Sequence, residues 1–279
     1  MFSYQGRFRL VWIFASVFVL TLCAPIFPEE IVTPNQIVSG NVDVMPVTDN
    51  ILVISDYFDA HRDSKEQLES GIGFLKRKLK YSGFRYDLLW RLSKLYYELG
   101  LRTKEKAQAA MYFDVGIQAG TKALMIQPKG KEALLWTAFN MWQNIRPLSG
   151  FSPKKILGAR KAKTTVEKLI WDNPASADGY YLLAEIYRES NRWVSVGDLK
   201  KARKSILRAI QINGNRVRNY LEYALICMDS NDWKPAKEAL LKALELPTEP
   251  DRAIENIEER QLAQKNLDIV LEKLGEKKK

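Results

Sequence analysis

The chain has 279 residues, of which 46% are hydrophobic, and 43 Lys and Arg against 33 Asp and Glu give a net charge of +10. This length and apolar content are enough for a sizeable buried core, which excludes a chain that is disordered throughout. With only two cysteines, Cys23 and Cys227, a disulfide framework is excluded as well.

The basic balance allows nucleic acid, anionic lipid or an acidic protein as a partner. Charges of both signs alternate along the predicted helices, which is typical of solvated helix faces, so we expect no nucleic acid partner. A membrane surface is the best functional alternative for the two densest basic clusters. These clusters are Lys154, Lys155, Arg160, Lys161 and Lys163, and then Lys200, Lys201, Arg203, Lys204 and Arg208.

Residues 1–28 have the pattern of a targeting segment. Arg7 and Arg9 precede a stretch from Leu10 to Pro28 that carries no charge, and Glu29 and Glu30 follow it. A positive start before an apolar run is typical of an export signal or a membrane anchor. We therefore expect an exported protein, periplasmic or in the cell envelope, that is tethered to a membrane.

The fate of this segment stays open between three alternatives. Ala24 is small enough for signal cleavage, but Pro25 follows it at a position that signal peptidases tolerate poorly. Cys23 resembles the lipidated cysteine of a lipoprotein, although Leu22 is too large for the position before it. Lipidation of Cys23, an uncleaved anchor and cleavage to a soluble form are the three interpretations.

Residues 29–60 are expected to form an extended linker. Pro34, Gly40 and Pro46 break any regular structure, and the β-branched residues around Ile51 to Ser55 suggest a short strand.

An internal repeat runs through residues 61–275. Its clearest unit, residues 217–248, matches the 34-residue helix-turn-helix template of tetratricopeptide (TPR) repeats without a gap. Earlier units are expected at 86–128, 131–174 and 177–214, the last two with insertions around 147–153 and 195–199. Each unit has a small residue at its eighth position, where two helices approach closely: Ser93, Ala138, Ala184 and Ala224.

Helical spacing of apolar residues also predicts a half-unit from Ser64 to Leu79 and a closing helix over 251–274. The predicted fold class is therefore all-α, a TPR-like solenoid of helical hairpins with a C-terminal capping helix. HEAT repeats are the main structural alternative, because three of the units are longer than 34 residues.

The arrangement of an export segment, four elongated hairpins and a closing helix resembles the TatT family of TPR proteins associated with TRAP transporters. The resemblance rests on the segment Leu246-Pro247-Thr248-Glu249-Pro250-Asp251 and on Glu255-Asn256. It implies an all-helical periplasmic lipoprotein that partners a substrate-binding protein and has an apolar pore or groove. The sequence around Cys23 departs from the family pattern.

In TPR arrays, positions 2, 5, 9, 12 and 13 of the first helix of each unit face the concave side. Here they predict an apolar groove for a hydrophobic ligand or partner segment. The alternative is that the closing helix or an insertion covers this wall. The candidate groove residues are Trp90, Tyr97, Leu135, Phe139, Trp142, Tyr181, Leu221 and Leu225. Since the asparagines of the carboxylate clamp of chaperone-binding TPR proteins are missing, a chaperone adaptor is not expected.

The sequence offers little for catalysis. Its single histidine, His61, lies outside the four full repeats, and one His with two separated Cys cannot form a metal cluster. Gly120-Thr121-Lys122 lacks the upstream glycine of a phosphate-binding loop. Glu132, Asp178 and Glu185 could pair across the groove, but on repeat helices such carboxylates usually serve as surface or cap residues.

We therefore expect a non-catalytic binding scaffold without cofactor or metal. Its concave groove would recognise a partner protein or an apolar ligand. As a TRAP-transporter accessory it would bind a periplasmic substrate-binding protein. The alternative is a general scaffold for the assembly of a cell-envelope complex.

Overall fold

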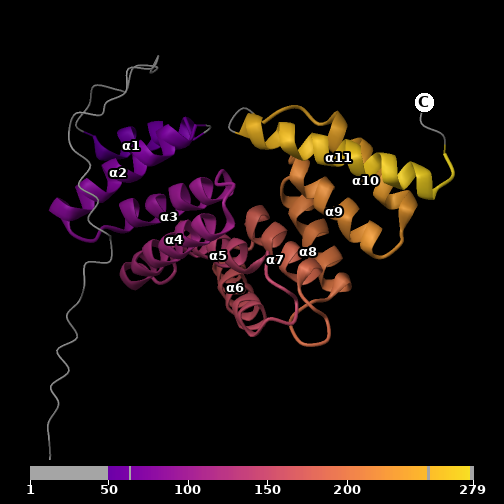
Figure 1. Cartoon of the computed structure of the whole chain (residues 1–279), viewed down its shortest axis with the longest axis horizontal. Coiled ribbons are helices and arrows are strands. Elements are labelled where there is room, and N and C mark those ends of the chain that lie inside the picture. The colour runs from indigo at the N-terminus through magenta and orange to yellow at the C-terminus, as the bar shows by residue number, and fades with distance from the viewer. Residues whose placement is uncertain (1–49, 63, 250–251, 277–279) are drawn as a thin grey trace, which may run out of the picture. The chain divides into compact units, whose positions relative to one another are not determined.

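The computed structural model describes residues 50–62, 64–249 and 252–276, so the expected targeting segment with Cys23 and most of the expected linker lie outside the described residues. Within these ranges the chain forms eleven α-helices and no strand, which confirms the predicted all-α class (Figure 1). The helices are α1 (Ile51–Ala60), α2 (Lys65–Ser82), α3 (Tyr86–Leu101), α4 (Lys106–Ile126), α5 (Lys131–Ile145), α6 (Pro153–Asp172), α7 (Ala177–Glu189), α8 (Leu199–Ile212), α9 (Val217–Asp229), α10 (Trp233–Glu245) and α11 (Ala253–Lys273).

Helix α1 corrects the expectation of an extended linker up to residue 60 with a strand near Ile51. The Asn50 side chain caps the helix by accepting a hydrogen bond of 3.0 Å from the backbone N–H of Leu52. Ile54 and Phe58, one helical turn apart, are buried, and Phe58 fits against Gly71 of α2. Burial of this single face favours the helix over the strand that the β-branched residues suggest.

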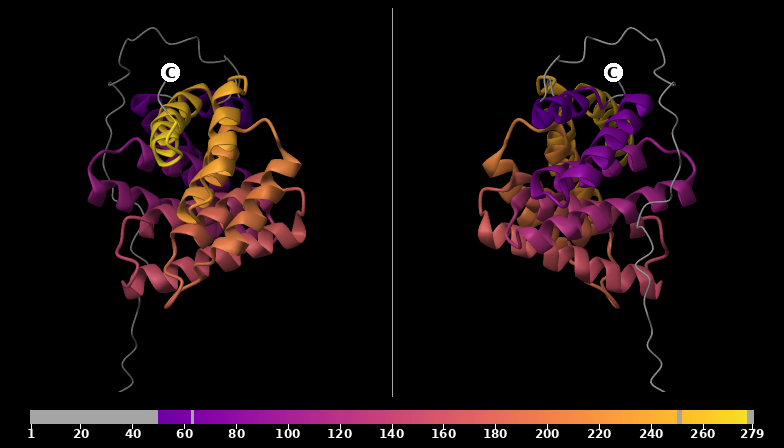
Figure 2. Two further views of the ribbon diagram at one scale, coloured as in Figure 1. Left: turned by 90° about the vertical axis from the view of Figure 1, so that its right-hand side faces the viewer. Right: turned by 90° about the vertical axis from the view of Figure 1, so that its left-hand side faces the viewer.

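From α3 onwards, consecutive helices pack as antiparallel pairs: α3 with α4, α5 with α6, α7 with α8, and α9 with α10. The first helices of neighbouring pairs also contact each other, and α11 covers α10 and α9. This stacking of hairpins, which both side views show (Figure 2), is the predicted solenoid with a closing helix.

The small residues at the eighth position of each unit are all buried, as their role in close packing requires. At Ser93, the hydroxyl donates a 2.8 Å hydrogen bond to the carbonyl of Gly116, and the Asn140 amide donates to the carbonyl of Ser93 at 2.9 Å. These bonds tie α3, α4 and α5 together. Gly116 is needed there because a methyl group on it would lie 2.3 Å from the Asn140 Oδ1.

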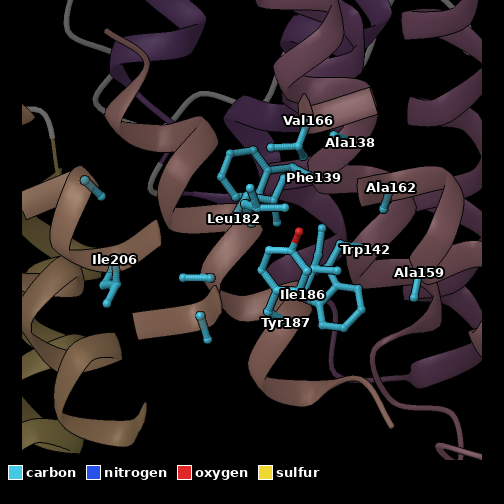
Figure 3. Close-up of a cluster of buried hydrophobic side chains, with 14 of the residues drawn as sticks. Ala138, Phe139, Trp142, Ala159, Ala162, Val166, Leu182, Ile186, Tyr187 and Ile206 are labelled. Carbon is cyan, nitrogen blue, oxygen red and sulfur yellow. The ribbon is translucent and has the colours of Figure 1, made fainter. Parts of the chain in front are cut away.

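A large cluster of buried side chains lies between α5, α6, α7 and α8 (Figure 3). Large side chains from α5 and α7 interdigitate with small ones from α6, so the helices approach closely. The labelled members are Ala138, Phe139, Trp142, Ala159, Ala162, Val166, Leu182, Ile186, Tyr187 and Ile206.

The array curves until the start of its last helix reaches the residues that follow α1 and α3. Both Figure 1 and Figure 2 place the start of α11 near the end of α1. Glu255 of α11 lies 3.5 Å from the Nε of Arg62, just after α1, and 3.7 Å from the Nη2 of Arg102 at the end of α3. The concave face is therefore bounded by α11 as well as by the repeat helices.

None of the helices within the described ranges is both long enough and apolar enough to cross a bilayer.

Candidate functional site: a charged cavity on the inner wall

A cavity of about 310 Å³ lies on the concave side of the array. It is lined by the first helices of successive hairpins, α3, α5 and α7, by the start of α9, and by the start of α11. Its volume is at the lower end of the range of small-ligand sites, which suits one or two side chains of a partner segment.

Four aromatic rings from three helices form the base of the cavity. The rings of Tyr97 and Phe139 have centroids 5.2 Å apart, those of Tyr97 and Trp136 are 5.5 Å apart, and those of Trp136 and Phe139 are 5.7 Å apart. Tyr181 of α7 extends this base. Such tilted rings give a rigid, amphipathic surface with a low entropy cost of binding.

Arg218, at the start of α9, stands over this aromatic base. Its guanidinium lies 4.4 Å from the ring centroid of Tyr181 and 5.9 Å from that of Phe139, within the range of cation–π contacts. Arg218 also donates a 2.5 Å hydrogen bond from Nη2 to Oδ1 of Asp178, which Arg216 contacts at 3.0 Å. Burial opposes ionisation of Asp178, but Arg218 and Arg216 lower its pKa below the usual value.

A second group of ion pairs lies further along the same wall. Arg146 donates two hydrogen bonds to Glu189, of 2.7 and 2.5 Å, and its Nη1 lies 3.3 Å from Glu185. Arg188 donates to both carboxylate oxygens of the buried Glu222, at 2.7 and 3.1 Å. Burial opposes ionisation of Glu189, yet its bond to Arg146 lowers the pKa. These charges are held in place by their partners.

Helix α11 contributes the acidic side of the cavity through Glu255, Glu258 and Glu259. Arg252, the residue before the helix, pairs with Glu259 at 2.8 Å. The lining as a whole holds six cationic and six acidic side chains, so it has no net charge although it is strongly polar.

Several arginines that line this site, among them Arg216, Arg218 and Arg252, have a buried Nε without a hydrogen-bond acceptor in the described part of the chain. Of these, Arg218 is the one whose guanidinium stands over the aromatic base. A buried donor without an acceptor is costly, and in native proteins such a group usually meets water or a ligand. The position next to Tyr181 and Phe139 is therefore suited to an oxygen acceptor from a bound molecule.

Of the eight predicted groove residues, the structure brings Tyr97, Phe139 and Tyr181 together at the cavity. Trp142 and Leu221 are buried in the hydrophobic core, and Leu135 and Leu225 pack against it. Trp90 stacks with the guanidinium of Arg91, whose central carbon lies 4.3 Å from its ring centroid. The expectation of an apolar wall is wrong, because twelve of the eighteen lining residues are acidic or basic.

The superhelical path of the array explains this difference. The predicted positions lie on one helix face, but the cavity crosses successive helices at different heights. It uses Tyr97 and Leu101 near the end of α3, Phe139 in the middle of α5, and Asp178 and Arg218 at the starts of α7 and α9. The arginines at the starts of α9 and α11 have a sequence signal of their own, since Arg216, Arg218 and Arg252 directly flank predicted helix starts.

The carboxylates that could have served catalysis are ion-paired or hydrogen-bonded. Asp178 and Glu185 bind Arg218 and Arg146, and Glu132 accepts a 3.0 Å hydrogen bond from the hydroxyl of Tyr86. Over the described ranges, His, Cys, Asp and Glu side chains form no group of three that could hold a metal ion.

This architecture defines a TPR-like helical-repeat protein. Its fold is similar to that of TTC0263, a TPR protein of Thermus thermophilus, with a TM-score of 0.58 and 15% identity over 75% of this chain and 97% of the other. MamA has 20% identity and a TM-score of 0.48 over 67% of this chain and 92% of its own.

Residues 54–187 match the family described as regulator of microtubule dynamics protein 1-3. A mouse relative, regulator of microtubule dynamics protein 3, is 30% identical over 146 residues, which is 52% of this chain. The chain spans only 29% of that relative's length. The matched residues run from α1 to α7 and include all four rings of the aromatic base. The family that matches here is a different one from TatT.

Proposed function

We propose that the chain is a non-catalytic scaffold that binds a segment of a partner protein in the cavity on its concave face. The observation that carries this proposal is the unpaired Nε of Arg218 beside the rings of Phe139 and Tyr181. A bound peptide can supply two complementary groups: a carbonyl oxygen that accepts a hydrogen bond from the arginine, and an apolar side chain that packs on the aromatic base.

The charge balance of the cavity favours a peptide over a purely apolar ligand. An apolar molecule would bury the twelve acidic and basic lining residues without giving them hydrogen bonds, which opposes binding. A peptide backbone supplies such bonds along its whole length. Arginine and aromatic residues are also the types that dominate the energy of protein interfaces.

The experiment that tests this function uses the full chain and a displayed library of short peptides. Selected peptides are measured by fluorescence anisotropy against the Trp136→Ala and Trp171→Ala variants. Trp136 lines the cavity, whereas Trp171 is 85% exposed at the end of α6 and serves as the matched control. We expect binding to weaken about tenfold or more in W136A alone, as for an interface hot spot. Peptides that bind both variants equally, or a library without binders, would contradict the proposal.

Two settings for the scaffold follow from different observations. The match over residues 54–187 favours a role related to microtubules, as the name of that family states. Co-sedimentation of the chain with polymerised tubulin tests this setting, and W136A should then reduce co-sedimentation while W171A should not.

The export-like sequence of residues 1–28 favours the other setting, a membrane-tethered envelope protein. There the partner would be a substrate-binding protein of a TRAP transporter or a component of an envelope complex. Fractionation of cells that express the full chain distinguishes the two settings, because only the second places the repeats in the periplasm.

A further inference from the structure

The two loops that lengthen the repeats lie side by side at one edge of the array. They are residues 146–152 between α5 and α6, and residues 190–198 between α7 and α8. A methyl group on Gly150 would lie 3.5 Å from the Cβ of Asn191, and Arg160 of α6 donates a 3.4 Å hydrogen bond from Nη2 to the carbonyl of Val194. The loop between α7 and α8 reaches the lower edge of the array in Figure 1.

These loops present large apolar side chains to the solvent. Trp193 is 78% exposed and Phe151 is 69% exposed, and Leu157, in the second turn of α6, is 58% exposed. Exposing large apolar side chains to water is unfavourable in free energy, so clusters of them on a surface usually mark a site that contacts an apolar phase.

The same edge is strongly basic. No Asp or Glu occurs between Pro147 and Val166, and Asp198 is the single acid between Ser190 and Lys204. Helices α6 and α8 have no acidic residue in their first turns, although the helix dipole favours negative charge there. Their first turns carry Lys154 and Lys200 instead. The Asp198 carboxylate caps the start of α8, whereas no side chain caps α6, so at α6 the positive helix end adds to the charge of the lysines.

The basic and apolar side chains share the outer face of α6. Lys154, Leu157 and Lys161 are three and four residues apart and therefore lie on one face, while Ala159 and Ala162 on the opposite face are buried. Lys155 has another role, because its Nζ donates to the carbonyls of Arg146 and Leu148, at 2.7 and 3.1 Å, and caps the end of α5.

We infer that this surface lies against the headgroup region of an anionic lipid bilayer. We call it the insertion patch and define it as Phe151, Lys154, Leu157, Arg160, Arg192, Trp193 and Lys200. A bilayer interface takes both kinds of side chain: the lysines and arginines bind anionic headgroups, and the aromatic and aliphatic side chains enter the boundary of the acyl chains. An acidic protein segment would pair with the cations but would leave the apolar loop tips in water.

The test measures binding of the full chain to vesicles of phosphatidylcholine alone and of phosphatidylcholine with phosphatidylserine. The apolar segment of residues 10–28 is present in every variant, so the measured quantity is the ratio of the two binding constants. Three variants are compared with the wild type: Phe151→Ser with Trp193→Ser, Lys154→Glu with Lys200→Glu, and the control Trp171→Ser. All five positions are exposed, so the fold is retained, which circular dichroism checks.

We expect the wild type and W171S to prefer phosphatidylserine vesicles to the same degree. Removing one cation near a bilayer surface should weaken binding about fivefold, and K154E/K200E should therefore lose most of the preference. F151S/W193S should reduce binding to the same vesicles. In a separate fluorescence measurement, we expect the tryptophan emission of the wild type to shift to the blue on binding and a Trp193→Phe variant to show a smaller shift.

A ratio that is the same for all four proteins would overturn the inference. So would binding of polyglutamate that depends on Lys154 and Lys200 while phosphatidylserine vesicles give no preference, since the partner would then be an acidic polypeptide.

Discussion

Asp178 and Arg218 form an ion pair that joins the start of α7 to the start of α9, with 2.5 Å between Oδ1 and Nη2. Both residues occupy the second position of their repeat, so a local sequence position becomes a contact between neighbouring hairpins. The pair also fixes the guanidinium over the rings of Tyr181 and Phe139. Stability and the geometry of the cavity thus depend on the same contact.

Replacing Asp178 with Asn should lower the free energy of unfolding by about 3 kcal/mol at neutral pH, because it leaves the buried Arg218 without its counter-charge. Asp229→Asn is the matched control, since Asp229 is half exposed and contacts Arg188 at 3.6 Å. Its loss should cost no more than about 1 kcal/mol. Urea denaturation measures both values, and equal losses would contradict the assigned role of the pair.

Because of the Asp178 carboxylate, we also expect the free energy of unfolding to depend on pH in the acid range. Arg218 and Arg216 lower the pKa of Asp178 against the opposing effect of its burial, so the native state binds this proton less readily than the unfolded chain. The contribution is therefore fully present above the unfolded value of 3.8 and is lost as the pH falls towards the lowered pKa.

We expect the free energy of unfolding of D178N to fall less steeply than that of the wild type as the pH drops below about 5. Some slope should remain in the variant, because Arg146 lowers the pKa of Glu189 in the same way despite burial. Parallel pH curves for the two proteins would show that Asp178 is not selectively stabilised as a carboxylate in the native state.

Replacing Trp142 tests whether its ring belongs to the hydrophobic core or to the groove. Its side chain is fully buried among α5, α6 and α7, so Trp142→Ala should destabilise the fold by about 3–5 kcal/mol. Trp171→Ala removes the same ring from an exposed position and should change stability by less than about 0.5 kcal/mol. Thermal unfolding compares them, and a stable W142A that loses only peptide binding would restore the groove interpretation.

The sequence was sufficient for the all-α solenoid because the repeated small residues report local packing. Ser93, Ala138, Ala184 and Ala224 need no knowledge of distant parts of the chain to indicate where helices cross. The cavity was only partly predictable, since its arginines and glutamates meet through the curvature of the whole array. Glu255 faces Arg62 from the opposite end of the array, and no local pattern encodes that contact.

The prediction of an extended linker with a strand at the position of α1 was wrong for a related reason. Val, Ile and Ser from 51 to 55 favour a strand locally, and the helix depends on Phe58 meeting Gly71 of α2. The propensity of a short segment is a weak guide when one buried face decides its structure.

Two glycines in helices give the last prediction, because their surroundings differ. A methyl group on Gly116 of α4 would lie 2.3 Å from Oδ1 and 2.5 Å from Cγ of Asn140, a side chain held by hydrogen bonds to Ser93 and Trp136. Gly116→Ala should therefore destabilise the protein by about 1–3 kcal/mol through overpacking. At Gly73 of α2 the nearest atom is the flexible end of Arg77, 3.4 Å away, so Gly73→Ala should stabilise the helix by about 0.4–1 kcal/mol. Chemical denaturation measures both changes in the free energy of unfolding, and changes of opposite sign would confirm that α3, α4 and α5 pack tightly around Asn140. A G116A variant of unchanged stability would mean that α4 and α5 tolerate a larger separation.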